Sequence, residues 1–178
     1  MAMDDQELAL AAARGDQAAF GQVLERHYDL LYRVAYRFLG RAAEAEDVAQ
    51  EVAMALAHKI RQFRGEAKLT TWLYQVVLNA CRDHGRKRVS LWRVQMAFVA
   101  ESERREADWA DSDARLRWLY QAIGRLDPAL KETALLVLAE AMTHAEAGEV
   151  LGVKESTVSW RMHEARKKLK AMVDQVHD

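Results

Sequence analysis

Apolar side chains recur every three to four residues along most of the chain, which is the spacing of one face of an α-helix. The first such run lies between Asp16, whose carboxylate can cap a helix N-terminus, and Gly40, a residue typical of a helix C-terminus. The pattern therefore predicts one long helix over residues 16–40. Its apolar positions are Phe20, Val23, Leu24, Leu31, Val34 and Phe38.

Two more helices are expected before residue 90. One begins near Ala43, where acidic side chains favour a helix N-terminus, and its apolar stripe consists of Val48, Val52, Ala55, Leu56 and Ile60. Residues 63–71 follow no period, so they are predicted to form a loop. The next helix extends over about residues 71–86 and is expected to bury Leu73, Val76, Val77 and Ala80.

Helical spacing returns after residues 90–112, which lack a clean period. Asp127 followed by Pro128 is typical of a capped helix start. Thr143 and Glu146 match a capping box, and Gly152 predicts a turn before a last helix from about Ser156. The apolar positions of the earlier helices in this part are Leu116, Leu119, Ile123, Leu126, Leu130, Ala134, Val137 and Leu138.

Composition agrees with a helical protein. Of the 178 residues, 51% are hydrophobic and 30% are charged, while 8 Gly and one Pro provide too few turns for a β-sandwich or barrel. No segment shows the two-residue alternation of a strand. We therefore predict an all-α chain of two small helical domains, residues 1–89 and 113–178, joined by a flexible acidic linker over residues 90–112.

The single cysteine, Cys81, excludes an internal disulfide framework and a zinc site built on cysteines. No run of about 18 apolar residues occurs, and the acidic N-terminus lacks the apolar core of a signal peptide. A cytoplasmic protein without membrane insertion is therefore expected. A lone cysteine on a predicted helix is more often a small buried hydrophobe than a redox switch.

Charge is unevenly distributed, although the net charge is only −1. Residues 59–93 carry 9 basic and 2 acidic side chains, and residues 154–170 carry 6 and 2, whereas residues 4–51 and 101–113 have net charges of −5 and −4. Two basic blocks on a near-neutral chain suggest two separate contacts with a polyanion. Solvated helix faces are the alternative for either block.

Residues 143–162 have the spacing of a helix-turn-helix. Gly148 lets the two helices approach closely, Gly152 occupies the turn, and Val158 packs between the helices. The inward face of the last helix is predicted to be Val158, Met162, Ala165 and Leu169, which leaves Ser159, Trp160, His163, Glu164 and Lys167 outside. An exposed tryptophan on a basic helix suits insertion into a groove or a partner surface, whereas a hairpin with no DNA role is the alternative.

The second expected helix carries Met54 on the polar face opposite its apolar stripe. An apolar side chain there is typical of a protein interface, and a stray surface methionine is the alternative. Its neighbours on this face are Asp47, Gln50, Glu51, His58 and Arg61.

The third expected helix carries a basic face that can neutralise phosphates, with an asparagine that can contact a base edge. Phe63 and Trp72 flank the preceding loop and can stack on unpaired bases, but core packing explains Trp72 at least as well. The residues of this face and its extension are Asn79, Arg82, Arg86, Lys87 and Arg88.

Together these segments resemble the extracytoplasmic-function sigma factors of bacterial RNA polymerase. The resemblance rests on residues 45–52 (AEDVAQEV), on Phe63-Arg64-Gly65, on residues 71–79 and, near the C-terminus, on residues 151–153, 157–158 and 161–166. It covers roughly residues 16–89 and 114–170, and several motifs in the right order make it far more specific than a lone helix-turn-helix.

The resemblance implies a chain with no chemistry of its own that binds core RNA polymerase, at the β′ clamp helices and the β flap, and directs it to promoters. The implied polymerase-binding residues are Asp47, Gln50, Glu51 and Met54. Residues implied to bind the single-stranded −10 element are Phe63, Gly65, Lys68, Thr71, Trp72, Asn79, Arg82, Arg86, Lys87 and Arg88. Residues implied to face the −35 element are Ser156, Thr157, Ser159, Trp160, Arg161, His163, Glu164, Arg166 and Lys167.

The resemblance also implies control by an anti-sigma factor and no cofactor.

The sequence departs from the family in two places. Basic residues are common where Ser159 and Glu164 stand, so no −35 base preference is carried over. Ala147 and Gly148 replace the usual bulky apolar residue and alanine, which is expected to loosen the helix-turn-helix by about 0.5–1 kcal/mol.

Two other function classes are possible on the residues alone. An autonomous helix-turn-helix regulator needs a dimer to read two half-sites, and the sequence shows no dedicated dimerisation element. A helical enzyme needs a recognisable site, yet the six histidines form neither a Glu-x-x-His nor a His-Glu-x-x-His motif. The chain also has no phosphate-binding glycine loop or nucleophile elbow, so neither enzymatic activity nor a metal site is expected.

Overall fold

The computed structural model describes residues 3–95 and 114–174, and no strand occurs in these two ranges. This confirms the predicted all-α fold. The chain divides into two compact units, unit 1 over residues 1–106 and unit 2 over residues 107–178. The predicted linker begins inside a helix that extends to Gln95, and its remaining residues lie outside the described ranges.

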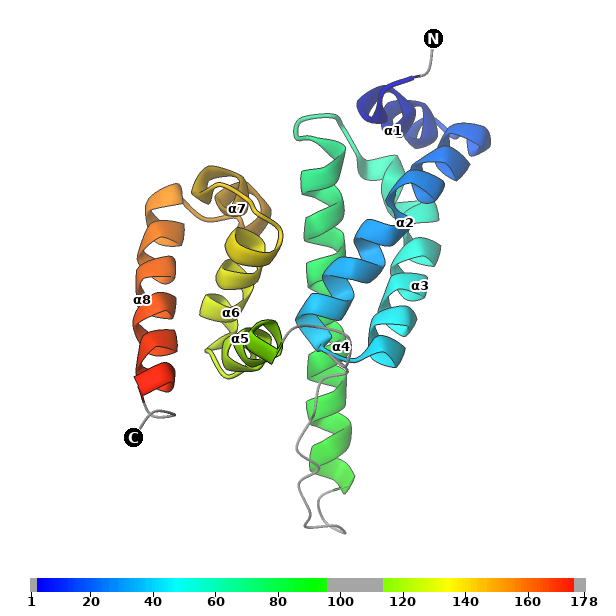
Figure 1. The fold of residues 1–178 in the computed structure, drawn as a ribbon. Coiled ribbons are helices and arrows are strands. Elements are labelled where there is room, and N and C mark those ends of the chain that lie inside the picture. The colour runs from blue at the N-terminus through cyan, green and yellow to red at the C-terminus, as the bar shows by residue number, and fades with distance from the viewer. Residues whose placement is uncertain (1–2, 96–113, 175–178) are drawn as a thin grey trace. The chain divides into compact units, whose positions relative to one another are not determined.

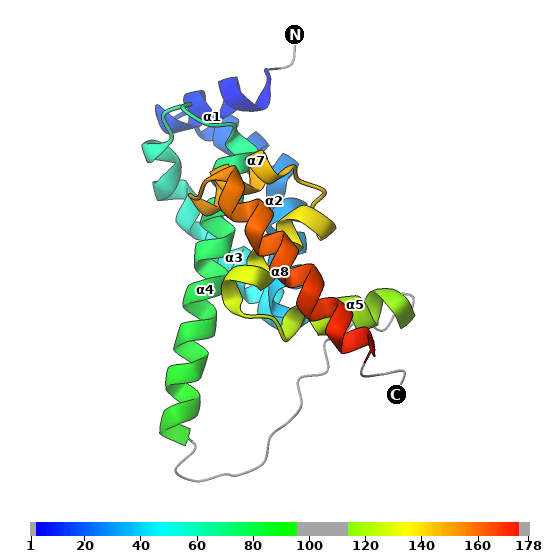
Figure 2. The same cartoon turned by 90° about the vertical axis from the view of Figure 1, so that its left-hand side faces the viewer.

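Unit 1 is a bundle built around one long helix (Figure 1). Its elements are α1 (Asp5–Ala13), α2 (Gln17–Leu39), α3 (Ala42–Lys59), the short 3-10 helix η1 (Ile60–Gln62) and α4 (Leu69–Gln95). Helix α2 packs against α1, α3 and α4. The C-terminal end of α4 extends beyond the other helices of this unit (Figure 2).

Both ends of α2 follow from the residues that flank it. Asp16 Oδ1 accepts hydrogen bonds from the backbone N–H groups of Ala18 (2.9 Å) and Ala19 (3.0 Å). Gly40 adopts a left-handed conformation with φ +75°, and its N–H donates to the carbonyl of Tyr36 at 2.8 Å. Both predicted caps are confirmed.

Helix α1 was not predicted, because its alanine-rich stretch shows no periodic apolar face. Asp4 and Glu7 form a capping box at its start, and Leu8 and Ala9 are completely buried. Asp5 anchors the helix to α2 through an ion pair with Arg26 (2.9 Å). The N-terminal helix is therefore an integral part of the unit 1 core.

The apolar stripes of α3 and α4 lie where the sequence predicts them. Val48, Val52, Leu56 and Ile60 on the first stripe, and Leu73, Val76 and Val77 on the second, are buried. Ala55 and Ala80 are only half-buried, so they border the core. Helix α4 begins two residues earlier and ends nine residues later than the expected range of 71–86.

Unit 2 contains α5 (Ala114–Gly124), α6 (Pro128–Ala134), the π-helical segment η2 (Leu135–Ala139), α7 (His144–Leu151) and α8 (Glu155–Asp174). Helix α8 packs against α6 and α7. Pro128 begins α6 as predicted. The core of the unit includes Ile123, Leu135, Leu136, Val158 and Met162.

The π-helical segment changes which side chains of this region are buried. A π-turn inserts an extra residue per turn, so the apolar face that began on α6 does not continue with a period of 3.6. Leu135 and Leu136 enter the core, whereas Leu138 is exposed and Val137 is half-buried. The prediction that Val137 and Leu138 continue the core face is therefore wrong.

The Asp127 side chain also differs from its predicted role. Asp127 stands at the N-cap of α6, but its carboxylate makes no capping hydrogen bond. It accepts instead from the ammonium of Lys168 on α8. The residue therefore joins two helices of unit 2, and Pro128 contributes the local start signal.

Titration of Asp127 should affect the stability of unit 2. The Lys168 ammonium lowers the pKa of this carboxyl, first through the hydrogen bond and then through charge attraction. A carboxyl with a lowered folded-state pKa stabilises the fold above its unfolded pKa, and this stabilisation is lost as pH falls through the folded value. We expect Asp127→Asn to lower Tm slightly at about pH 7, and we expect this Tm difference to shrink as the pH is lowered below about 4 in thermal circular dichroism. A Tm difference that does not change with pH would contradict this.

Candidate nucleic-acid interface

The helix-turn-helix of unit 2 is built from local capping signals. The Thr143 hydroxyl accepts from the Glu146 N–H (3.2 Å), and the Glu146 carboxylate accepts from the Thr143 N–H (2.9 Å). Gly152 ends α7 in a left-handed conformation with φ +67°. The Val153 N–H then donates to the Gly148 carbonyl at 3.0 Å, which closes the turn. The capping box and the turn glycine are as predicted.

Gly148 is the position at which the turn comes closest to α7. A Cβ atom at this residue would lie 2.8 Å from the backbone carbonyl oxygen of Val153 and 3.5 Å from the backbone nitrogen of Glu155. The first distance is too short for any real carbon–oxygen contact. The expectation that a glycine here loosens the packing is therefore wrong, because its missing side chain is what permits the close approach.

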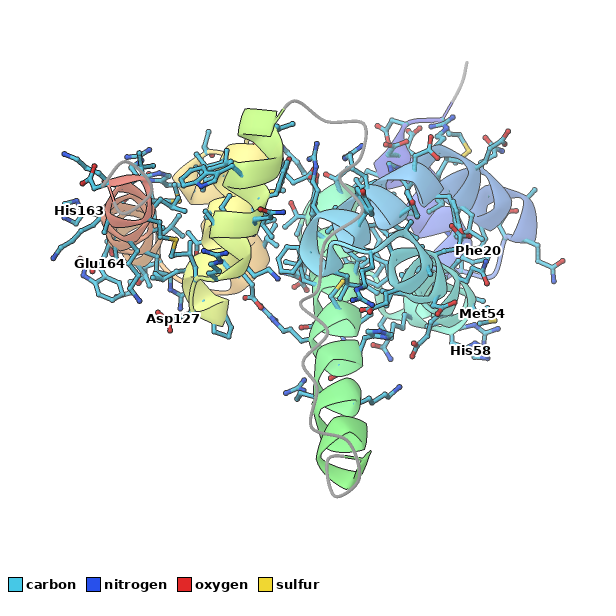
Figure 3. All side chains as sticks on the ribbon, turned by 60° about the horizontal axis from the view of Figure 1, so that its bottom comes forward. Phe20, Met54, His58, Asp127, His163 and Glu164 are labelled. Atoms are coloured by element: carbon cyan, nitrogen blue, oxygen red, sulfur yellow. The ribbon has the colours of Figure 1, made fainter. Side chains whose placement is uncertain are left out.

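Helix α8 divides into a buried and an outward face, as the sequence predicts. Val158, Met162 and Ala165 are completely buried, and Leu169 is 9% exposed. Trp160 is 61% exposed. Figure 3 shows His163 on the side of α8 that points away from the other helices of its unit. The outward residues of the candidate −35 set are Ser156, Ser159, Trp160, His163, Arg166 and Lys167, and its half-buried members are Thr157, Arg161 and Glu164.

Ser159 has a partner that the sequence did not suggest. Its hydroxyl lies 2.9 Å from Nδ1 of His144, which is the first residue of α7. The contact joins the start of α7 to the outward face of α8. His144 therefore borders the candidate −35 surface.

The loop between η1 and α4, together with the first turn of α4, contains the first part of the candidate −10 set. Phe63 is 6% exposed, and its ring lies 5.6 Å from the half-buried ring of Trp72 at an interplanar angle of 59°. Thr71 is also buried, whereas Lys68 is exposed. In the free chain the two rings therefore pack on each other, and Lys68 is the accessible member of this group.

The N-terminal helix contacts this loop through Gln6. Its Nε2 donates to the carbonyls of Gly65 (3.1 Å) and Ala67 (3.0 Å), and its Oε1 accepts from the Leu69 N–H (3.1 Å). Sequence reasoning missed these contacts because it missed α1. The capping-box spacing of Asp4 and Glu7 could have revealed the helix, but no sequence signal indicates what Gln6 touches.

The basic face of α4 is partly neutralised by neighbouring groups. Arg82 donates to the Asn79 side-chain oxygen (2.8 Å), and Arg86 is paired with Asp83 on the same helix (2.6 Å). Lys87 lies 3.7 Å from a carboxylate oxygen of Glu51 on α3. The Arg88 side chain lies outside the described part of the chain. The face thus combines cations with carboxylates at its edges.

A shallow pocket of about 250 Å³ lies between α3 and α4 beside this basic face. Its polar lining residues are Glu51, Lys59, Asn79, Asp83, Arg86 and Lys87. Members of both candidate sets therefore line one pocket, with Glu51 from the polymerase-binding set and Asn79, Arg86 and Lys87 from the −10 set.

Helix α3 presents its polar face to solvent, with one apolar side chain on it. Met54 is 70% exposed, and Figure 3 shows it near His58 on the outer side of the helix. Asp47, Gln50 and Glu51 are exposed on the same helix. Gln50 is held by a hydrogen bond to Glu46 (2.9 Å). The four candidate polymerase-binding residues are thus accessible together.

Comparison with known proteins places the two units in one family. The sigma-70 region 2 model matches residues 23–90, and the sigma-70 region 4 model matches residues 116–169. RNA polymerase sigma factor NccH of Alcaligenes xylosoxydans xylosoxydans is 31% identical over 179 residues, which cover 95% of this chain and 94% of NccH. The ECF RNA polymerase sigma factor SigM of Mycobacterium tuberculosis is 32% identical over 166 residues, covering 93% and 82%. The chain belongs to the extracytoplasmic-function sigma factors.

Solved structures agree with this assignment. The structure of CnrH in complex with the cytosolic domain of CnrY superposes on this chain with a TM-score of 0.69. The two chains are 29% identical, and the match covers 96% of this chain and 97% of CnrH. The family resemblance inferred from the motifs is therefore confirmed. The region 2 match begins at residue 23, so α1 lies outside it.

Within 3–95 and 114–174, no helix combines the length and apolar character needed to cross a bilayer. The same residues contain no group of three or more His, Cys, Asp or Glu side chains arranged to hold a metal ion.

Replacing Gly148 should disturb the helix-turn-helix of the sigma factor. Gly148→Ala places a methyl group 2.8 Å from the Val153 carbonyl, so the turn must shift. We expect a loss of about 1–3 kcal/mol in the free energy of unfolding of unit 2, measured by chemical denaturation. Gly124→Ala is the matched control, because a Cβ atom at Gly124 meets nothing within 4 Å. Equal stability of the two variants would refute the close-approach argument.

Proposed function

We propose that this sigma factor binds core RNA polymerase through the exposed face of α3 and directs it to promoters with two recognition elements. The outward face of α8 reads the −35 element as duplex. The loop before α4 and the basic face of α4 take up the −10 element as a single strand. The observation that carries the proposal is that both sigma-70 regions occur in one chain, each with an accessible polar or basic face.

Duplex recognition by α8 is supported by the way the helix is held. Its buried residues fix its rotation, so the outward residues keep a constant orientation. Trp160 is large, exposed and near the N-terminal end of the helix, which is the end that a recognition helix inserts into the major groove. Arg166 and Lys167 are placed further along the same helix, where they can contact phosphates.

Single-strand binding in unit 1 requires more rearrangement. Phe63 is buried against Trp72 in the free chain, so stacking of Phe63 on a base would need the pair to separate. Trp72 and Lys68 are more accessible, and Asn79 is exposed. We propose that these three side chains meet the strand first and that Phe63 and Thr71 form the floor beneath them.

We also propose that an anti-sigma factor occupies the exposed apolar positions when the protein is inactive. CnrH, which is similar over nearly its whole length, was solved with the cytosolic domain of another protein bound. Met54 on unit 1 is an accessible apolar residue that such a partner can cover. Cytoplasmic location follows from this role.

The decisive experiment is run-off transcription with sigma-free core polymerase and fragmented genomic DNA, followed by sequencing of the products. Discrete new start sites that depend on this chain support the proposal and reveal both promoter elements. Absence of binding to core polymerase would overturn it. Tight duplex binding by a dimer without polymerase would favour the autonomous regulator.

Truncation of Met54 should weaken polymerase binding. We expect Met54→Ala to raise the Kd for core polymerase about 5- to 30-fold, because the truncated side chain no longer makes the apolar contact with polymerase. Tm should stay unchanged, since Met54 is exposed in the free chain. Met3→Ala is the control, since Met3 is also an exposed methionine of unit 1 but lies outside the proposed surface. The affinities are measured by fluorescence anisotropy. Equal Kd values for the two variants would remove Met54 from the interface.

Truncation of Trp160 should affect only promoters with an intact −35 element. We expect Trp160→Ala to lower run-off transcription about tenfold from the intact promoter and less than about twofold when the −35 element is scrambled. Leu116→Ala, at another exposed apolar position of unit 2, is the control. A uniform loss on both templates would show that Trp160 acts elsewhere.

A further inference from the structure

One side chain ties α1 to the loop before α4. Gln6 uses its whole amide for this purpose, with two donated hydrogen bonds to the loop carbonyls of Gly65 and Ala67 and one accepted from the Leu69 N–H. The three distances are between 3.0 and 3.1 Å. The carbonyl groups of this loop would otherwise need hydrogen bonds from water. They accept them instead from a residue about 60 positions away in the sequence.

The start of α4 needs such a partner. The Trp72 N–H donates to the Lys68 carbonyl (3.2 Å), which makes Lys68 the N-cap of the helix. A lysine ammonium has no acceptor, so it cannot cap the free N–H groups of the first turn. The Gln6 carbonyl oxygen accepts from Leu69, the first residue of the helix, and so acts as a cap supplied by another helix.

The loop is also packed against α1 at Gly65. This residue has φ +75°, and a Cβ atom there would lie 3.4 Å from a methyl carbon of Leu10 and 3.5 Å from Nε2 of Gln6. The loop backbone therefore faces α1 in a conformation that favours glycine. Its charged side chains Arg64, Glu66 and Lys68 are all exposed.

Helix α1 is a firm support for these contacts. Leu8 and Ala9 are fully buried, and Asp5 is paired with Arg26 on α2. Gln6 thus acts from a helix whose position is fixed by the core. Because the region 2 match begins at residue 23, this support is not part of the segment that defines the family here.

We propose that Gln6 is a positioning residue for promoter recognition: it holds the loop over residues 64–68 and the first turn of α4 in the shape that receives the −10 strand. The inference rests on the proposed function of this loop. Gln6 does not touch DNA in this role. It sets the backbone from which Lys68, Thr71 and Trp72 act, and so its loss should reduce −10 discrimination more than overall fold stability.

The test uses the full chain with Gln6→Ala and Gln6→Glu. The glutamate variant keeps the side-chain length and an acceptor but removes both donors, so it separates hydrogen bonding from bulk. Gln22→Ala is the control, since Gln22 is an exposed glutamine of α2. Three quantities are measured: amide hydrogen exchange at Leu69 by NMR, the ratio of run-off transcription from a promoter with an intact −10 element to one with a substituted −10 element, and the Kd for core RNA polymerase.

We expect Leu69 exchange in Gln6→Ala to be about tenfold faster, because Gln6 is its acceptor. The −10 discrimination ratio should fall about 5- to 10-fold in both Gln6 variants, while core polymerase affinity changes less than about twofold. Gln22→Ala should match the parent chain in all three measurements.

Two results would overturn the inference. Unchanged Leu69 exchange in Gln6→Ala would show that the contact does not hold the loop. Faster exchange with an equal loss on both promoters would show that Gln6 supports the fold and not the reading of the −10 element. Failure of the proposed function is recognised separately, because the parent chain would then give no discrete start sites.

Discussion

The hydrophobic face of α2 is the contact on which unit 1 depends, because α1, α3 and α4 all pack against this one helix. Leu31, Val34 and Ala35 on α2 are at most 1% exposed. Helices α3 and α4 each bury only one side, because each packs against the central helix α2 with one stripe of apolar residues. Their other sides are therefore free to carry polar and basic residues without loss of core, and these sides hold the proposed polymerase and DNA contacts.

Unit 2 also leaves one helix face exposed, and there the constraint is the tight turn between α7 and α8. The turn between α7 and α8 is compressed at Gly148, where no side chain fits. Three completely buried residues then fix the rotation of α8 about its own axis. The proposed DNA-binding face consists of the α8 residues that the core leaves exposed. The exposure of Trp160 therefore follows from the packing of Val158, Met162 and Ala165.

Signals that act over a few residues were the most predictable part of the fold. The caps at Asp16 and Thr143, the glycine turn at Gly152 and the apolar stripes all express local rules. The missed features depend on neighbours that are distant in sequence or on irregular geometry. Exposure of Leu138 follows from the π-helical segment, and the diverted carboxylate of Asp127 follows from a lysine 41 residues away.

The candidate site was predictable in its placement but not in its internal contacts. Periodicity alone put Met54 on a polar face and the basic residues of α4 on one side. It could not show that Phe63 and Trp72 pack on each other, because both packing and base stacking use the same aromatic character. The role of Gln6 was likewise invisible, since it depends on a tertiary contact.

The carboxylates beside the α4 cations have a thermodynamic consequence. A phosphate that approaches Arg86 or Lys87 must displace Asp83 or Glu51, which already act as built-in counterions. Fewer mobile ions are then released on binding than the number of basic residues suggests, so the salt dependence is shallower and affinity for arbitrary polyanions is weaker. On the proposed function, weak intrinsic binding by this face leaves polymerase to raise the local concentration of the −10 strand.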